Sequence, residues 1–275
     1  MDRWILLFLL FLIYSFLGWL CESIYCSIPA KRFINRGFLT GPVCPVYGVG
    51  GILTVLLLTP FQNRLPLLYL SGVLVTSAVE YATGFLLETV FHTRWWDYSN
   101  RRFQIRGRVC LRNSLLFGLM AVALMKWIHP LLLRLLEAVP KAFLPWIAGA
   151  ALLCFAADTA ASVRAALQLS GKLRELESVL KEIRAKSEEW RRAGLTSLQR
   201  AFSSSHEELL RRLQERQSGI EKSLRLLHRR LLGAFPSMDS QKYRAALQRL
   251  RAAAEERRCA RRQKRAAKKS GQKNT

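Results

Sequence analysis

The stretch that decides the fold is WILLFLLFLIYSFLGWLC, residues 4–21, a run of 18 residues without a formal charge. A helix rises ~1.5 Å per residue and needs ~20 residues to cross a hydrocarbon core of ~30 Å. The run exceeds the ~7–15 residues of a signal-peptide core, and no small-x-small cleavage site follows it. We therefore predict a retained membrane-spanning helix.

Further apolar segments follow this helix along the first 165 residues. The expected spans cover about 4–25, 41–60, 66–88, 109–129 and 143–163. Arg112 and Lys126 lie near the ends of the fourth span, where long cationic side chains reach the headgroups. The expected fold class is all-α: a polytopic membrane helix bundle of about five transmembrane helices, in the cell membrane.

Charge is distributed unevenly along the chain. Residues 1–163 carry a net charge of +7 and residues 164–275 carry +17. With five spans, the short connections on one side hold eight Lys and Arg, against four on the other. The positive-inside rule then predicts the N-terminus outside and the C-terminal tail in the cytoplasm.

The sequence after residue 165 has the pattern of soluble helices. Leu173, Leu176, Leu180 and Ile183 follow the 3-4-3 spacing of a coiled-coil seam. We expect coiled-coil-like helices over 166–236, formed either as a hairpin within the chain or as a homo-oligomer.

Residues 237–275 are expected to form a basic helical tail, partly disordered. The stretch RRCARRQKRAAKK (257–269) contains no aromatic residue that could stack on bases, so nucleic acid is the least favoured partner. Each Lys or Arg near an anionic leaflet contributes about 1 kcal/mol, which favours the bilayer surface as a partner. A solvated tail that only fixes the topology is the alternative.

Acidic residues within the spans are the first candidates for a site. Glu80 lies inside the third span, Glu88 lies eight residues later on roughly the same face, and Glu22 ends the first span. An unpaired carboxylate at bilayer depth costs at least ~2.5–3.5 kcal/mol, so these groups should be protonated, paired or facing water. Two interpretations stay open: a polar substrate cavity, or ion pairs with residues such as Arg36 that hold the bundle together.

Two further motifs also have two interpretations each. GPVCPVYGVGG (41–51) is rich in Gly and Pro, which fits a kinked packing helix or a broken helix that lines a cavity. HTRWWDYS (92–99) fits an aromatic anchor at the membrane interface or a lid that contacts substrate.

Enzyme signatures are absent from the sequence. It contains no GxxxxGK[ST], HExxH or GxSxG motif, its four histidines are scattered, and its six cysteines form no CxxC pair. We expect no catalytic residue, metal or cofactor, so any ATP hydrolysis would come from a separate ATPase subunit. A lipid-directed acid–base role for Glu22, Glu88 or Asp97 is a weaker alternative.

Five motifs, in order and at matching spacing, resemble a known family. They are YSFLGWLCESIY (14–25), NRGFLTGPVCPVYGVG (35–50), VEYATGFLLE (79–88), RWWDYS (94–99) and GRVCLRNSLLFG (107–118). The resemblance is to the family called putative ABC-transporter type IV, or putative ABC transporter permease, which small eukaryotic transmembrane proteins share. It covers about residues 5–130 and implies a bacterial polytopic membrane protein.

The resemblance also implies which residues matter. A substrate or polar cluster would comprise Glu22, Asn35, Arg36, Glu80, Glu88, Trp95, Trp96, Asp97 and Tyr98. Helix-break or packing positions would be Gly37, Gly41, Pro42, Pro45, Tyr47 and Gly48. The implied function is an ABC-type permease component of unknown substrate; the alternative is a membrane scaffold or regulator that recruits partners or anionic lipid through its basic tail.

Overall fold

The computed structural model describes residues 2–31, 33–192, 208, 211–220, 223, 226–235, 238–240, 242–253 and 263. The chain forms two compact units. The first contains Met1–Ala166 and Arg230–Met238, and the second contains Leu167–Arg229 and Asp239–Thr275.

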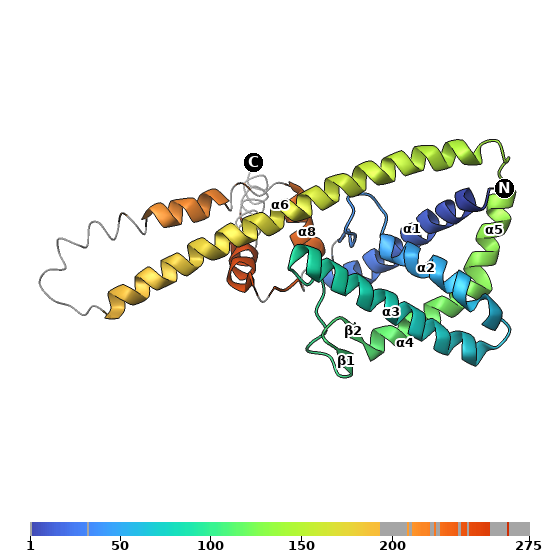
Figure 1. The fold of residues 1–275 in the computed structure, drawn as a ribbon, viewed down its shortest axis with the longest axis horizontal. Coiled ribbons are helices and arrows are strands. Elements are labelled where there is room, and N and C mark those ends of the chain that lie inside the picture. Colours follow the sequence, from blue (N-terminus) through green and yellow to red (C-terminus); the bar gives the residue numbers. More distant parts are fainter. Residues whose placement is uncertain are drawn as a thin grey trace, which may run out of the picture. The chain divides into compact units, whose positions relative to one another are not determined.

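The first unit is a helix bundle (Figure 1). Its helices are α1 (Arg3–Ala30), α2 (Pro45–Leu58), the 3₁₀ helix η1 (Thr59–Phe61), α3 (Leu65–Phe91), α4 (Leu111–Ala123), the π-helix η2 (Leu124–Ile128), α5 (His129–Glu137) and the first part of α6 (Leu144–Arg192). The strands β1 (Gln104–Ile105) and β2 (Val109–Cys110) form a small antiparallel hairpin in the connection between α3 and α4. The predicted all-helical membrane bundle is therefore confirmed in its class, with this hairpin as an addition.

Among the described residues, four helical stretches are long and apolar enough to cross a membrane: Arg3–Ile28, Leu65–Phe91, Leu111–Glu137 and Leu144–Glu189. The predicted count of about five spans is not confirmed, because the second expected span corresponds to the shorter apolar helix Pro45–Phe61. Pro45 is the first residue of α2, a position where the missing N–H of proline costs no hydrogen bond. The 14 residues of α2 would cover only ~21 Å at ~1.5 Å per residue.

Two other spans run further than the sequence predicted. The fourth continues from α4 through η2 into α5, so the expected 130–142 connection is mostly helical and the chain turns only after Glu137. The fifth continues without interruption as α6 to Arg192. The change from apolar to charged residues near residue 164 does not end this helix, because Leu, Ala, Arg, Glu and Lys all have high helix propensity.

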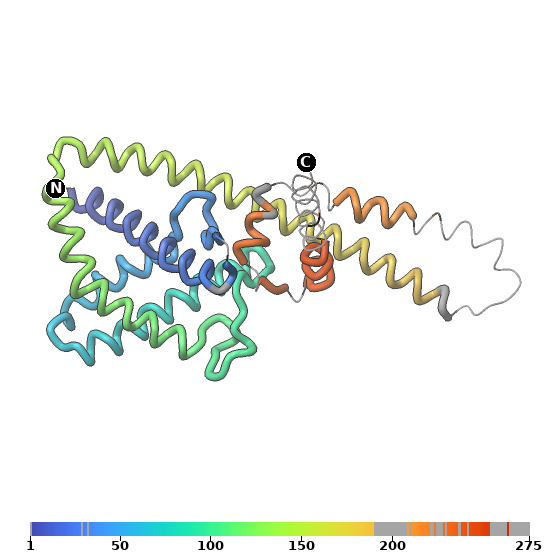
Figure 2. Tube along the Cα trace, turned by 180° about the vertical axis from the view of Figure 1, so that it is seen from behind, coloured from blue at the N-terminus to red at the C-terminus, as the bar shows by residue number. Residues whose placement is uncertain are grey.

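Consecutive helices pack side by side in the order α1, α2, α3, α4, as the trace in Figure 2 shows. Glycines permit the close approach of α2 to α1. A Cβ on Gly48 would lie 2.6 Å from the Phe11 carbonyl oxygen, and one on Gly51 would lie 2.6 Å from the Tyr14 ring. The GPVCPVYGVGG motif therefore starts a helix at Pro45 and packs it tightly, and α2 is continuous from Pro45 to Leu58.

The outer faces of the bundle carry apolar side chains. Leu153 is 73% exposed and Trp146 is 80% exposed on α6, and Leu74 is 71% exposed on α3. Inside, Leu58, Leu68, Val122 and Met125 form a buried cluster. An apolar exterior around a small core suits a protein whose solvent is lipid.

The second unit contains the continuation of α6 and the helical residues 211–220 and 244–253. Leu173 and Leu176 of the predicted seam are buried. Lys172 Nζ donates to the Ser223 carbonyl oxygen at 2.7 Å, and the Ala246 amide donates to Glu177 Oε2 at 2.9 Å. The helices are thus joined within one chain. The serine run 203–205 and most of the basic stretch 257–269 lie outside the described residues.

Candidate functional site

A cavity of about 310 Å³ lies inside the first unit. Its walls come from α1, α2, α3, α4 and η2, together with the connections that precede α2 and α4. The polar side chains that line it are Tyr14, Glu22, Arg36, Tyr47, Thr54, Thr76, Glu80 and Tyr98. Its apolar lining includes Leu17, Val79, Phe117, Met120, Leu124 and Ile128. The lining of the cavity is therefore mostly apolar and includes three charged side chains, Glu22, Arg36 and Glu80.

Glu22 and Arg36 form the first charged group of the lining. Arg36 Nε lies 3.0 Å from Glu22 Oε1, and their side chains are 12% and 24% exposed respectively. The Tyr47 side chain lies beside the Glu22 carboxylate. The Arg36 amide donates to Ser23 Oγ at 3.2 Å, which holds the connection after α1 against its last turns. This pair satisfies one buried carboxylate of the cavity.

Glu80 is the second carboxylate, and it is only 9% exposed. The Tyr98 side chain lies beside its carboxyl group. Its Oε2 atom is buried and has no hydrogen-bond partner in the part of the chain that the structure describes. A buried carboxylate oxygen without a hydrogen-bond partner lowers the free energy of unfolding. Glu80 is therefore a candidate functional residue and not a stabilising one.

The β1–β2 hairpin positions the two aromatic residues that reach the cavity from the α3–α4 connection. The Tyr98 amide donates to the Gly107 carbonyl oxygen at 2.8 Å, and Trp96 Nε1 donates to the Arg108 carbonyl oxygen at 2.9 Å. Gly107 has φ of +72°, a conformation that glycine adopts most easily. A Cβ there would also lie 2.5 Å from Asp97 Oδ1.

Burial raises the pKa of Tyr98 above its ordinary value, and the nearby Glu80 charge raises it further. The Tyr98 hydroxyl therefore stays protonated over the physiological range. It serves as a constant donor beside Glu80.

The π-helix η2 forms part of the apolar wall. Leu124 and Ile128, its first and last residues, both line the cavity. Single-turn π-helices inside α-helices occur often at functional sites. Directly after η2 in the chain, His129 Nδ1 and the Tyr14 hydroxyl share a 2.6 Å hydrogen bond that connects α5 to α1.

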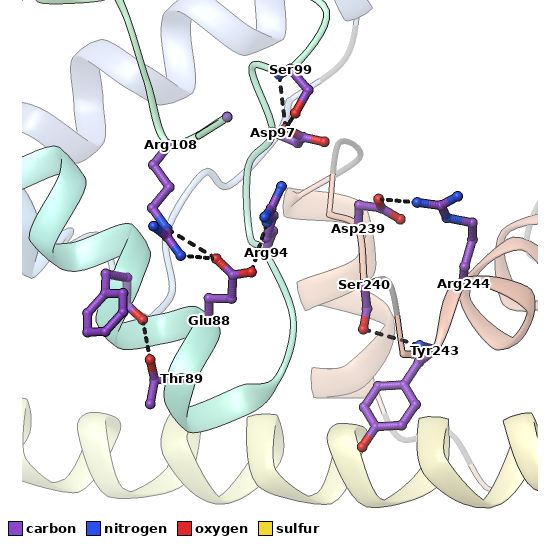
Figure 3. A network of polar contacts seen from close by, with 12 residues as sticks. Glu88, Thr89, Arg94, Asp97, Ser99, Arg108, Asp239, Ser240, Tyr243 and Arg244 are labelled. Atoms are coloured by element: carbon purple, nitrogen blue, oxygen red, sulfur yellow. Dashed lines mark hydrogen bonds and ion pairs between the residues drawn. The ribbon is translucent and has the colours of Figure 1, made fainter. Parts of the chain in front are cut away.

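Glu88 does not line the cavity. Figure 3 shows its carboxylate between two arginines: Arg94 Nε lies 2.9 Å from Oε1, and Arg108 Nη2 lies 2.7 Å from Oε2. Arg108 also lies over the rings of Tyr81 and Phe85. These contacts attach the loop after α3 to the end of that helix, which is a structural role.

Three other predicted site residues also lie away from the cavity lining. Asp97 Oδ1 accepts from the Ser99 hydroxyl at 2.6 Å (Figure 3). Asn35 Oδ1 accepts from Trp19 Nε1 at 2.7 Å, and Asn35 Nδ2 donates to the Thr40 carbonyl oxygen at 3.1 Å. Trp95 is 3% exposed and packs among aromatic rings.

Of the predicted packing positions, only Tyr47 lines the cavity. Pro45 and Gly48 belong to α2, whereas Gly37, Gly41 and Pro42 lie in the connection before it. Asp158 of α6 holds that connection in place, because its Oδ2 accepts from the Gly41 amide at 2.8 Å and its Oδ1 from the Thr40 amide at 2.9 Å.

The segment Arg230–Met238, which we call the docked segment, packs on the same connection. Arg230 Nη1 donates to the carbonyl oxygens of Gly37 at 3.0 Å and Leu39 at 2.8 Å, and Nη2 donates to that of Phe38 at 2.7 Å. Burial lowers the pKa of Arg230, and the charge of Asp158 partly offsets this effect.

The docked segment also reaches residues of the site. The Phe235 ring lies 4.9 Å from that of Trp95 in an edge-to-face arrangement, and the Arg36 guanidinium lies 4.8 Å from the Phe235 ring centre. Arg36 donates a hydrogen bond to the Ala234 carbonyl oxygen. Arg36 therefore contacts both the cavity and a segment almost 200 residues further along the chain.

The described residues contain no group of three or more His, Cys, Asp or Glu side chains that could hold a metal ion. The sequence analysis did not predict several residues of the cavity lining, above all Tyr14, Cys21, Thr76 and Phe117. Helical spacing could have indicated Tyr14 and Cys21, since positions 14, 18 and 21 share a face of α1 with Glu22. Phe117 depends on the packing of α4, which no local pattern reveals.

One comparison with known proteins gives a match. The model of the family described as Putative ABC-transporter type IV matches residues 9–163, which is more than half of the chain. No curated protein and no solved structure gives a significant match.

Proposed function

The chain belongs to the Putative ABC-transporter type IV family, and from this premise we propose that it is the membrane-embedded permease component of a transporter. The observation that carries the proposal is the cavity within the bundle, which contains a buried carboxylate, Glu80, with an oxygen that lacks a partner. Ionisable residues inside a membrane bundle commonly mark a substrate or ion pathway. Glu22, Arg36, Glu80, Trp96 and Tyr98 would contact the substrate.

The proposed orientation places the connections 31–44 and 92–110 in the cytoplasm, following their excess of Lys and Arg. The polar end of the cavity would then open toward the cytoplasm. The sequence has no phosphate-binding GxxxxGK[ST] loop, so a separate ATPase subunit would supply the energy. We propose no catalytic role for this chain.

Affinity purification of the full-length protein in a mild detergent, followed by mass spectrometry, tests the proposal. We expect an ATPase subunit at stoichiometric yield. The matched variants Glu80→Gln and Glu88→Gln should both retain it, and only Glu80→Gln should lose substrate-stimulated ATP hydrolysis. Recovery of the protein without any ATPase would contradict the ABC-type assignment.

A membrane scaffold or regulator is the second candidate function, and the docked segment favours it. Arg230 and Phe235 link the C-terminal part of the chain to the connection that contains Arg36. A partner or an anionic leaflet bound by the basic tail could then act on the cavity. Replacing the Lys and Arg of 257–269 by Gln separates the two functions. A scaffold would lose partner binding in this variant and keep it in Glu80→Gln.

A further inference from the structure

The charges that line the cavity do not cancel. Arg36 is the counter-ion of Glu22, at 3.0 Å, and its guanidinium also donates to the Ala234 carbonyl oxygen and stacks on Phe235. Glu80 has only the neutral Tyr98 hydroxyl as a partner in the described part of the chain, and its Oε2 has none. One carboxylate of the lining therefore lacks a counter-ion.

Aromatic rings also belong to the cavity lining that contains Glu80. Trp96, Tyr98, Tyr47 and Phe117 all belong to the lining, and the rings of Tyr47 and Phe117 meet edge to face at 6.2 Å. The face of an aromatic ring attracts a cation, by ~0.5–1 kcal/mol at exposed sites and ~2 kcal/mol or more where water is excluded. A carboxylate next to aromatic rings is the environment that binds organic ammonium groups.

The remainder of the cavity suits a hydrocarbon chain. Met120, Leu124 and Ile128 line it beyond Phe117. The volume of about 310 Å³ is at the lower end of the range for small-molecule sites, ~300–1,000 Å³. A ligand that fills it would be an amphiphile with a single charged group at one end.

We propose that the cavity binds monovalent organic cations of the alkylammonium type, with the ammonium group at Glu80 and the alkyl chain along η2. This inference rests on the proposed transport function and names the class of its substrate. An anionic amphiphile fits less well, because Arg36 is already paired with Glu22, and Glu80 would repel a second negative charge.

Binding of three probes of equal chain length tests the proposal: octylammonium, octan-1-ol and octanoate. The measurement is isothermal titration calorimetry on the full-length protein in lipid nanodiscs, with empty nanodiscs subtracted. We expect octylammonium to bind at least about tenfold more tightly than octanol, as for one charge-assisted hydrogen bond, and octanoate to bind weakest. Glu80→Gln should abolish the preference for the cation, whereas Glu88→Gln should keep it.

Two results would overturn the inference. Equal affinity for octylammonium and octanol would show that Glu80 does not act as an anion, and tighter binding of octanoate would show an anion site at Arg36. A circular dichroism spectrum of Glu80→Gln identical to that of wild type excludes misfolding as the cause of lost preference. Uptake of octyltrimethylammonium into proteoliposomes that also contain the ATPase subunit separates the two proposals. Selective binding without uptake would support the ligand class and contradict transport.

Discussion

Glu22 and Arg36 form an ion pair in the wall of the cavity, with Arg36 Nε 3.0 Å from Glu22 Oε1. Glu22 lies in α1, whereas Arg36 lies in the connection that the docked segment covers. Removing one member of this pair leaves the other buried without its counter-ion. Arg36 thus contacts the docked segment directly and lines the cavity together with Glu22.

Glu22→Gln should destabilise the folded protein by about 2–3 kcal/mol, somewhat less than the ~3–5 kcal/mol of a fully buried pair, because the side chains retain some exposure. The free energy of unfolding in mixed detergent micelles measures this. Arg244→Gln is the matched control, since its pair with Asp239 at 3.5 Å is largely exposed and should contribute ~0–1 kcal/mol. Equal effects of the two substitutions would contradict the role of the Glu22–Arg36 pair.

Arg230→Gln should loosen the docked segment. The planar guanidinium donates to three consecutive carbonyl oxygens, of Gly37, Phe38 and Leu39, which an amide group cannot reproduce. Amide hydrogen exchange in α8 (Leu226–Ala234) should accelerate by about tenfold or more, as charge-assisted hydrogen bonds are lost. Arg230→Lys should give an intermediate rate. Exchange at the wild-type rate in Arg230→Gln would show that these bonds do not hold the segment.

Alkaline pH should destabilise the protein through Tyr98. Its folded-state pKa is raised by burial and by Glu80, so its contribution to stability is complete below the unfolded pKa of ~10 and is lost as pH rises through the folded value. Unfolding free energies measured between about pH 8 and pH 11 should fall more steeply above pH ~10 for wild type than for Tyr98→Phe. Parallel profiles for the two proteins would argue against a buried, protonated Tyr98.

Gly48→Ala should disturb the packing of α2 on α1. The new methyl group would lie 2.6 Å from the Phe11 backbone oxygen, which cannot move aside without shifting the helix, so we expect a loss of about 1–3 kcal/mol. Gly50→Ala is the matched control two residues further along α2, where the nearest atom, Val79 Cγ1, is at 3.9 Å. The melting temperatures of the two variants in detergent provide the comparison. A Gly48→Ala variant as stable as Gly50→Ala would contradict the close approach.

The membrane-bundle class was predictable because apolar runs of span length with few charges are typical of transmembrane helices. Pro45 shows where this reasoning failed. Apolarity placed residues 41–60 in one span, whereas the prolines begin the helix only at Pro45. The length of α6 was also missed, since the change in composition near residue 164 indicates a change of solvent and does not require a helix end.

The candidate site was predictable only in part. Depth in a span singled out Glu80 and Glu22, and the cavity contains both. The same reasoning grouped Glu88 with them, but the two arginines that bind Glu88 come from a loop whose path the sequence does not reveal. The docked segment is the clearest omission. Its contacts join Arg230 to residues more than 190 positions earlier, which no local pattern can indicate.

The accessibility of Cys21 to a polar reagent tests most directly whether the bundle contains a ligand cavity within the membrane. Cys21 of α1 lines the cavity, whereas Cys154 of α6 does not, and both side chains are exposed. Single-cysteine variants in membrane vesicles would be treated with a water-soluble, positively charged methanethiosulfonate reagent, on inverted and right-side-out preparations. We expect modification of Cys21 from one side and no reaction of Cys154, because it faces lipid. Protection of Cys21 from both sides, or equal modification of the two cysteines, would contradict a water-accessible cavity in the bundle.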